Sequence, residues 1–194
     1  MNCILPSIAL CLVSTVALGQ AVARPLDVAV TSAKGKFQGY VYKAKGVAKS
    51  IDCTEFVLAV VNDLTKSCGK KLSAKQRTTL VVAGVKAAEL QGLVGAGDKS
   101  IRGVQQALID AGLGKAVNPQ DAAPGDLVQY WYKTKSGKWA GHAGLIERVT
   151  KDAAKKTTTL TIFGSHKSTL RKRADGAKDT KAGGIGSGPR LVLP

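Results

Sequence analysis

The change of sequence pattern that decides the fold falls at residues 124–132, which read Pro-Gly-Asp-Leu-Val-Gln-Tyr-Trp-Tyr. Before this stretch apolar residues recur at helical spacing, and from Leu127 onward they alternate with period two. The Pro-Gly-Asp triplet is typical of a turn between the two patterns. A helical first half followed by antiparallel strands predicts an α+β domain.

Three helices are predicted before this point, over residues 53–64, 74–93 and 100–112. Ser50 or Asp52 can cap the first of them, which places Cys53 at a helix N-terminus. One face of the third helix is apolar and consists of Ile101, Val104, Leu108 and Ile109.

Strands are predicted over residues 127–132, 143–149 and 157–163, with 191–193 as a further short strand. Residues 151–158 are expected to form an extended hairpin between two of them. The Gly- and Lys-rich stretch 174–189 is predicted to be a loop. Within it, residues 183–188 resemble a phosphate-binding loop in composition, but they lack the strand before and the helix after, so a flexible loop is expected.

Composition limits the class of protein. The chain has 194 residues, enough for one ordinary domain, and 44% hydrophobic with 22% charged residues excludes disordered, collagen-like and coiled-coil chains. The formal net charge is +16, from 29 Lys and Arg against 13 Asp and Glu.

The N-terminus has the pattern of a secretory signal peptide. Residues 3–19 are uncharged and mostly apolar, and Ala21-Val22-Ala23 forms a cleavage pattern before Arg24. The expected organisation is a signal peptide over 1–23 and a single domain over 24–194, secreted or periplasmic, with a membrane anchor of similar length as the open alternative. No later stretch is apolar for the ~20 residues that a membrane span needs.

Removing residues 1–23 removes no charge, and it leaves Cys53, Cys68, His142 and His166 as the complete set of Cys and His residues. A thiol nucleophile needs a lowered pKa, a base within reach and a group that orients the base. Cys53 at a helix start is expected to have a lowered pKa. His142 near the start of one strand and His166 at the end of the next are expected to supply the base and its orienting group.

Three short motifs then resemble, in order and spacing, the NlpC-type branch of papain-like cysteine peptidases and amidases. They lie at residues 52–57, 124–128 and 141–146, and the resemblance covers the chain from about Tyr40 to His166. It implies a papain-like fold, with N-terminal helices packed on a small antiparallel sheet.

By residue, the resemblance implies Cys53 as nucleophile, His142 as general base and His166 as the third polar member, with no cofactor and no metal. Such enzymes cut peptide or amide bonds in the stem peptides of peptidoglycan. A backbone N–H at the helix start would hold the oxyanion. Either Tyr40 or Tyr42 stands where a family tyrosine helps to bind substrate.

One departure from the family pattern concerns the residues after the nucleophile. Thr54-Glu55 stands where the family has Ser-Gly. A carboxylate at this place disfavours a thiolate unless it points away from it.

Two other interpretations of the same residues are disfavoured. A disulfide between Cys53 and Cys68 is disfavoured, because a helix over 53–65 rises ~18 Å and the return to Cys68 recovers ~10 Å at most. Zinc ligation by Cys53, His142 and His166 fits none of the compact ligand spacings.

The alternatives for function are a related thiol amidase or acyltransferase, and an inactive module that binds the cell wall or another polyanion. Basic residues over 167–173 carry no stacking aromatic pattern. The expected partner is therefore peptidoglycan or another anionic wall polymer rather than nucleic acid.

Overall fold

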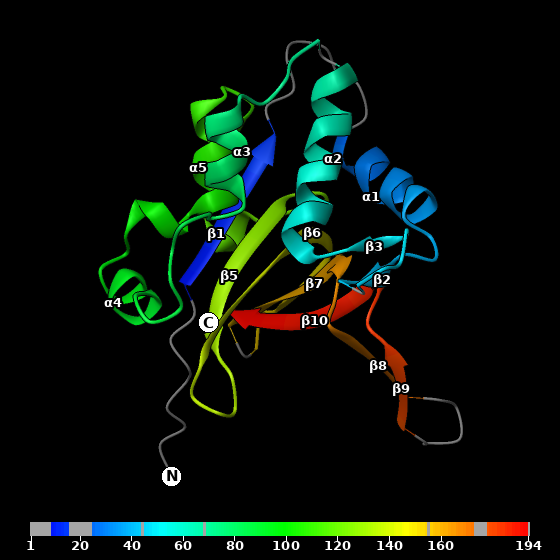
Figure 1. The fold of residues 1–194 in the computed structure, drawn as a ribbon. Coiled ribbons are helices and arrows are strands. Elements are labelled where there is room, and N and C mark those ends of the chain that lie inside the picture. Colours follow the sequence, from blue (N-terminus) through cyan, green and yellow to red (C-terminus); the bar gives the residue numbers. More distant parts are fainter. Residues whose placement is uncertain are drawn as a thin grey trace.

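The protein is an α+β domain built on one antiparallel sheet (Figure 1). The computed structural model describes residues 9–15, 25–43, 45–67, 69–154, 156–172 and 178–193. The sheet has the strand order β10-β7-β6-β5-β1-β4. Its strands are β1 (Ala9–Thr15), β4 (Gly114–Ala116), β5 (Leu127–Lys133), β6 (Trp139–Asp152), β7 (Thr157–Ser165) and β10 (Ile185–Leu193).

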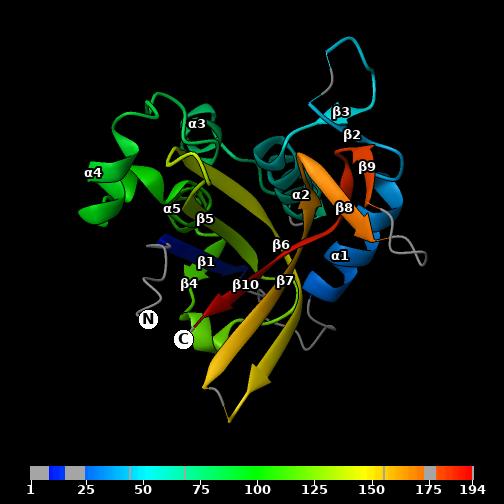
Figure 2. The same cartoon turned by 90° about the horizontal axis from the view of Figure 1, so that it is seen from below.

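The helices form two groups over the sheet, α1 with α2 and α3 with α5 (Figure 2). Their bounds are α1 (Pro25–Lys36), α2 (Cys53–Ser67), α3 (Ala74–Leu80), α4 (Leu90–Gly95) and α5 (Gly103–Asp110), with short 3-10 turns η1 (Lys99–Ile101) and η2 (Pro119–Asp121). Among the described residues, none of the helices is long and apolar enough to cross a membrane.

Two small ladders complete the described part of the chain. In the first, β2 (Val41–Tyr42) runs parallel to β3 (Ser50–Ile51). In the second, β8 (Ser168–Lys172) runs antiparallel to β9 (Lys178–Ala182). Figure 1 shows β8 and β9 on the same side of the molecule as β2 and β3.

The period-two pattern of β5 separates two buried clusters. Leu127 faces the cluster beneath the helices, whereas Val128 and Tyr130 belong to a second cluster made mainly by β5, β6, β7 and β10. Gln129 is buried on the helical side, where its Oε1 accepts a hydrogen bond of 2.9 Å from the N–H of Val104 at the start of α5. The predicted strand and its alternation are confirmed.

Helix α2 joins the helical layer to the sheet through aromatic contacts. Phe56 is fully buried, and its ring meets Phe37, directly after α1, at 5.3 Å and Phe163 of β7 at 5.9 Å between centroids. Such edge-to-face pairs add roughly 0.5–1.5 kcal/mol each beyond burial. This packing fixes the helix that begins at Cys53 against the strand that leads to His166.

The single helix predicted over 74–93 is wrong. Helix α3 ends at Leu80, the chain turns through Val82 and Gly84 with φ of 53° and 89°, and a separate helix α4 follows. Gly103 at the start of α5 packs against this turn so closely that a Cβ there would lie 2.7 Å from the carbonyl oxygen of Leu80. Helix α3 therefore ends beside a contact with Gly103, which is distant from it in the sequence.

The third predicted helix is confirmed in α5, with two differences. It is preceded by the 3-10 turn η1, and Ile109 is 41% exposed instead of lying on the buried face with Val104 and Leu108.

The loop predicted over 174–189 is also wrong within the described residues. Lys178–Ala182 forms β9, and β10 begins at Ile185 and pairs with β7. The last strand is therefore longer than the predicted 191–193, because β7 provides an edge for it to pair with.

Residues 9–15, which fall inside the predicted signal peptide, form strand β1 between β5 and β4. The signal peptide and its cleavage near Ala23 stay a prediction. Cys53 lies in α2, His142 lies in β6 and His166 directly follows β7, and none of these elements includes a residue of 1–23.

Candidate active site

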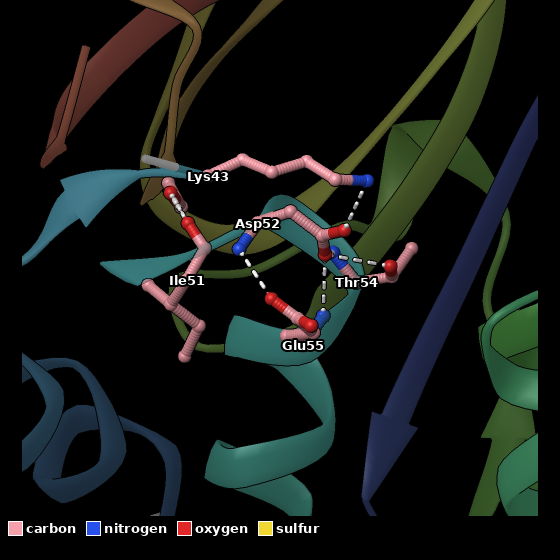
Figure 3. A network of polar contacts seen from close by, with 6 residues as sticks. Lys43, Ile51, Asp52, Thr54 and Glu55 are labelled. Atoms are coloured by element: carbon pink, nitrogen blue, oxygen red, sulfur yellow. Dashed lines mark hydrogen bonds and ion pairs between the residues drawn. The ribbon is translucent and has the colours of Figure 1, made fainter. Parts of the chain in front are cut away.

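The start of α2 is capped by its preceding residue (Figure 3). Asp52 Oδ1 accepts hydrogen bonds from the N–H of Thr54 at 2.9 Å, from the N–H of Glu55 at 2.8 Å and from the Thr54 hydroxyl at 2.8 Å. In return, Glu55 Oε2 accepts from the N–H of Asp52 at 2.8 Å. Of the two predicted caps Asp52 is confirmed, and the pair forms a capping box.

The capping box gives the Glu55 carboxylate, which could disfavour a thiolate at Cys53, a partner in the backbone. That carboxylate bonds back to the backbone of Asp52. Asp52 accepts three N–H groups of the first turn. The N–H groups of Thr54 and Glu55 donate to its side chain, and the N–H of Phe56 donates to its carbonyl at 2.9 Å. Within the described residues, the N–H of Cys53 is left without an acceptor from another residue.

Cys53 is a free cysteine with 9% of its surface exposed. Burial raises the pKa of its thiol, and the charge of Asp52 adds to the rise, while hydrogen bonds from the backbone of Ala143, Thr54 and Cys53 itself oppose it. The predicted lowering of the thiol pKa is wrong, because desolvation of the thiolate outweighs the helix N-terminus. The resting group is a neutral thiol.

The backbone next to Cys53 is tied to the sheet. Ser165, at the end of β7, is fully buried and donates a hydrogen bond of 2.6 Å to the carbonyl of Ile51. Ala143 of β6 is close enough for its backbone to hydrogen-bond the Cys53 sulfur. The thiol therefore lies beside the strand segment that also carries His142.

His142 lies in β6 opposite Tyr130 of β5, with the two rings 5.7 Å apart. Burial and, second to it, the adjacent His166 lower the pKa of His142 to about 3. Its Nε2 is buried and has no hydrogen-bond partner in the part of the chain that the structure describes. The imidazole is therefore neutral and retains an unused nitrogen.

His166 follows β7 directly and lies against His142, with ring centroids 4.7 Å apart and planes at 36°. Burial lowers the pKa of His166, and the hydrogen bond to the carbonyl of Gly186 opposes this effect. That bond joins Nε2 to the Gly186 oxygen at 2.9 Å. The contact between the two imidazoles is thus a ring contact, and no hydrogen bond between them is present among the described residues.

Of the three predicted site residues, two lie in direct contact, and the third adjoins the strand that carries one of them. His142 and His166 touch, and Cys53 adjoins β6 through Ala143. In the described residues Cys53 makes no hydrogen bond to an imidazole nitrogen. Cys68, the other thiol of the predicted mature chain, lies outside the described residues.

Tyr40 and Tyr42, the two candidates for substrate contact, differ in their surroundings. The Tyr40 ring packs edge-on against Phe37 at 5.4 Å and contacts the helical core. Burial, together with the charges that Cys53 and Asp52 can carry, raises the pKa of Tyr42 to about 12. Of these two tyrosines, Tyr42 is therefore the one whose hydroxyl lies near the thiol.

Two more tyrosines belong to the site and were not predicted. Tyr130 and Tyr132 have ring centroids 5.8 Å apart, and burial raises the pKa of Tyr130, with Tyr132 and Cys53 adding to the rise. Tyr130 is the register partner of His142, and period two places Tyr132 on the same face of β5. This alternation is the sequence signal that could have identified both tyrosines.

A cleft of about 1250 Å³ opens beside these residues. Cys53 itself is not among the lining residues. The lining includes Tyr42, Tyr130, Tyr132, His142 and His166, the basic residues Lys167 and Arg190, and the stretch 183–191.

The described residues contain no group of three His, Cys, Asp or Glu side chains that could hold a metal ion. Compared with protein-family models, with curated proteins and with solved structures, the chain matches none.

Proposed function

We propose that the protein is a thiol hydrolase of the papain-like, NlpC-type class that cleaves peptide or amide bonds in peptidoglycan stem peptides. The observation that carries the proposal is the placement of Cys53 at the capped N-terminus of α2, against the strand that bears His142, with His166 in contact with that imidazole. A nucleophile, a base and a third polar group are the parts that acyl transfer by a thiol requires.

The resting groups define the first chemical step. The neutral thiol of Cys53 transfers its proton to the neutral imidazole of His142 as sulfur attacks the substrate carbonyl carbon. The imidazolium then protonates the leaving amine, the C–N bond breaks and a thioester remains. Water, deprotonated by His142, hydrolyses the thioester and restores the thiol.

The oxyanion formed during attack needs a donor at the helix start. The N–H groups of Thr54, Glu55 and Phe56 are engaged by Asp52, so they are not available to the substrate. The N–H of Cys53 is the donor that we assign to this role. Tyr42 is the candidate for substrate contact, since its hydroxyl lies near the thiol and it lines the cleft.

The proposed substrate class rests on the basic residues of the cleft and on the predicted export of the protein. Lys167 and Arg190 line the cleft, and the whole chain carries a formal charge of +16. Stem peptides of peptidoglycan present free carboxylates, which basic side chains attract. The predicted signal peptide assigns the mature protein to the periplasm or the exterior, where this polymer is found.

A second candidate is a module that binds the wall without cleaving it. The observations that favour it are the raised pKa of the buried Cys53 thiol and the missing hydrogen bond between Cys53 and His142. The position of Glu55 does not favour it, because that carboxylate is used in the capping box.

The test is digestion of purified sacculi, with mass spectrometry of the released fragments. The wild type is expected to release new amines, and Cys53→Ala and His142→Ala are each expected to release none while keeping their far-ultraviolet circular dichroism. Cys68→Ala is the matched control for loss of a thiol and is expected to behave as the wild type. Hydrolysis retained by Cys53→Ala contradicts the proposal, whereas sacculus binding by all variants without any hydrolysis supports the module.

A further inference from the structure

The glycine-rich stretch at residues 183–188 joins two parts of the candidate site. On one edge, the carbonyl of Gly183 accepts a hydrogen bond of 2.7 Å from the N–H of Tyr42. On the same edge, the N–H of Ile185 donates to the carbonyl of Tyr40 at 3.3 Å. The backbone of the segment that bears Tyr42 is thus held by this stretch.

The other edge holds His166 by both its backbone and its ring. The N–H of His166 donates to the carbonyl of Gly184 at 3.0 Å, and its Nε2 lies 2.9 Å from the carbonyl oxygen of Gly186. A carbonyl oxygen can only accept, so the proton of this second bond belongs to Nε2. In the neutral ring, Nδ1 is then the unprotonated nitrogen.

The close approach of this stretch to His166 requires glycine. A Cβ at Gly188 would overlap the imidazole of His166, and a Cβ at Gly183 would overlap the backbone carbonyls of His166 and Lys167. A Cβ at Gly184 would lie 2.8 Å from the carbonyl oxygen of Tyr40. Glycine at these positions therefore permits contacts that any other residue would force apart.

We propose that residues 183–188 are a positioning element, in which the Gly186 carbonyl and the bare backbone of Gly188 hold the His166 imidazole as the Nε2–H tautomer against His142. The role of this tautomer in catalysis rests on the proposed function, whereas the positioning itself does not. Gly188 is a positioning residue, because it acts on the site through His166.

The first test reads the tautomer directly in the wild-type chain. The chain has two histidines, so a long-range proton–nitrogen NMR spectrum of ¹⁵N-labelled protein near neutral pH contains two imidazole patterns. His142→Ala and His166→Ala assign them by the pattern that each removes. We expect His166 to show a protonated Nε2 and an unprotonated Nδ1. A protonated Nδ1, or rapid averaging between the two nitrogens, overturns the proposal.

The second test moves the ring. Gly188→Ala is expected to displace the His166 imidazole, to replace its single-tautomer pattern by an averaged one and to lower kcat on sacculus fragments by roughly 10–100-fold. Gly92→Ala is the matched control, since a Cβ added at this helical glycine meets nothing within 4 Å. A wild-type His166 pattern in Gly188→Ala overturns the proposal.

The remaining outcomes distinguish failure of the positioning element from failure of the proposed function. Where Gly188→Ala does not fold, the wild-type tautomer alone decides. A wild type that shows the expected tautomer but no hydrolysis supports the positioning element and contradicts the proposed function. A wild type that hydrolyses sacculi with His166 in the other tautomer contradicts the positioning element and supports the proposed function.

Discussion

Asp52 has two separable effects on the residue that follows it, and two substitutions distinguish them. Its Oδ1 caps α2 through the N–H groups of Thr54 and Glu55, and its charge raises the pKa of Cys53. Asp52→Ala removes both effects. Asp52→Asn removes the charge and keeps an oxygen that caps helices about as well.

The magnitude follows from the contacts. Loss of an N-cap costs about 1 kcal/mol, with a range of roughly 0.5–2 kcal/mol. The ion pair with Lys43 adds little, because it spans 3.5 Å and the Lys43 side chain is 70% exposed. For a chain of this size, 1 kcal/mol corresponds to about 2–4 °C in Tm. Asp52→Ala is therefore expected to melt a few degrees below the wild type, and Asp52→Asn close to it.

The assay combines thermal unfolding with the rate of alkylation at Cys53, measured by peptide mapping. Both substitutions remove a negative charge beside the thiol, so alkylation is expected to be faster in both, after allowance for stability. Equal Tm values for all three proteins would refute the capping argument. A loss in Asp52→Asn as large as in Asp52→Ala would show that charge, not hydrogen bonding, stabilises the helix start.

The pH dependence has a definite sign. Burial alone would raise the pKa of Asp52, but hydrogen bonds from Glu55 and Thr54 and the charge of Lys43 hold it below its ordinary value of 3.8. A lowered pKa in the folded state gives stability that is present above the unfolded pKa of about 3.9 and is lost as the pH falls through the folded pKa. The stability difference between the wild type and Asp52→Ala should therefore be constant near neutral pH and shrink below about pH 4.

The remaining predictions concern packing, reactivity and charge. Ser165→Ala removes the buried donor to the Ile51 carbonyl and is expected to cost roughly 1–3 kcal/mol in urea unfolding; an unchanged midpoint would contradict it. Gln129→Leu leaves the N–H of Val104 buried without its acceptor and should cost a similar amount, about 1–3 kcal/mol, by the same measurement. Because burial raises the pKa of Cys53, its alkylation should be slow at neutral pH and rise through and beyond the ordinary thiol range; a fast, pH-independent rate would exclude this. Sedimentation with sacculi should weaken between about 0.1 and 1 M salt, as the screening length falls from ~10 to ~3 Å, and salt-independent binding would argue against an electrostatic partner.

Local signals in the sequence identified the elements on which the site is built. The Asp52 cap, the apolar spacing of α2 and the alternation of β5 each depend on residues a few positions apart, and the structure confirms all three. The order of Cys53, His142 and His166 on a helix start, a strand and a strand end was also predicted. These features could be predicted because helical capping and strand alternation are short-range effects.

Long-range pairing decided what the sequence pattern missed. Residues 183–188 are expected to be a loop from their glycines alone, yet four of their hydrogen bonds are made with His166, Tyr40 and Tyr42, more than 15 positions away. The break between α3 and α4 likewise coincides with a contact from Gly103.

By itself the sequence determined the α+β class, the start of α2, the strands β5 to β7, and the small set of Cys and His residues from which a site could be drawn. Tertiary structure decided the protonation of that site and the placement of its rings. It buries Cys53 and His142, so that the thiol pKa rises and the imidazole pKa falls to about 3. Desolvation depends on everything packed around a group, and no spacing of residues along the chain can specify it.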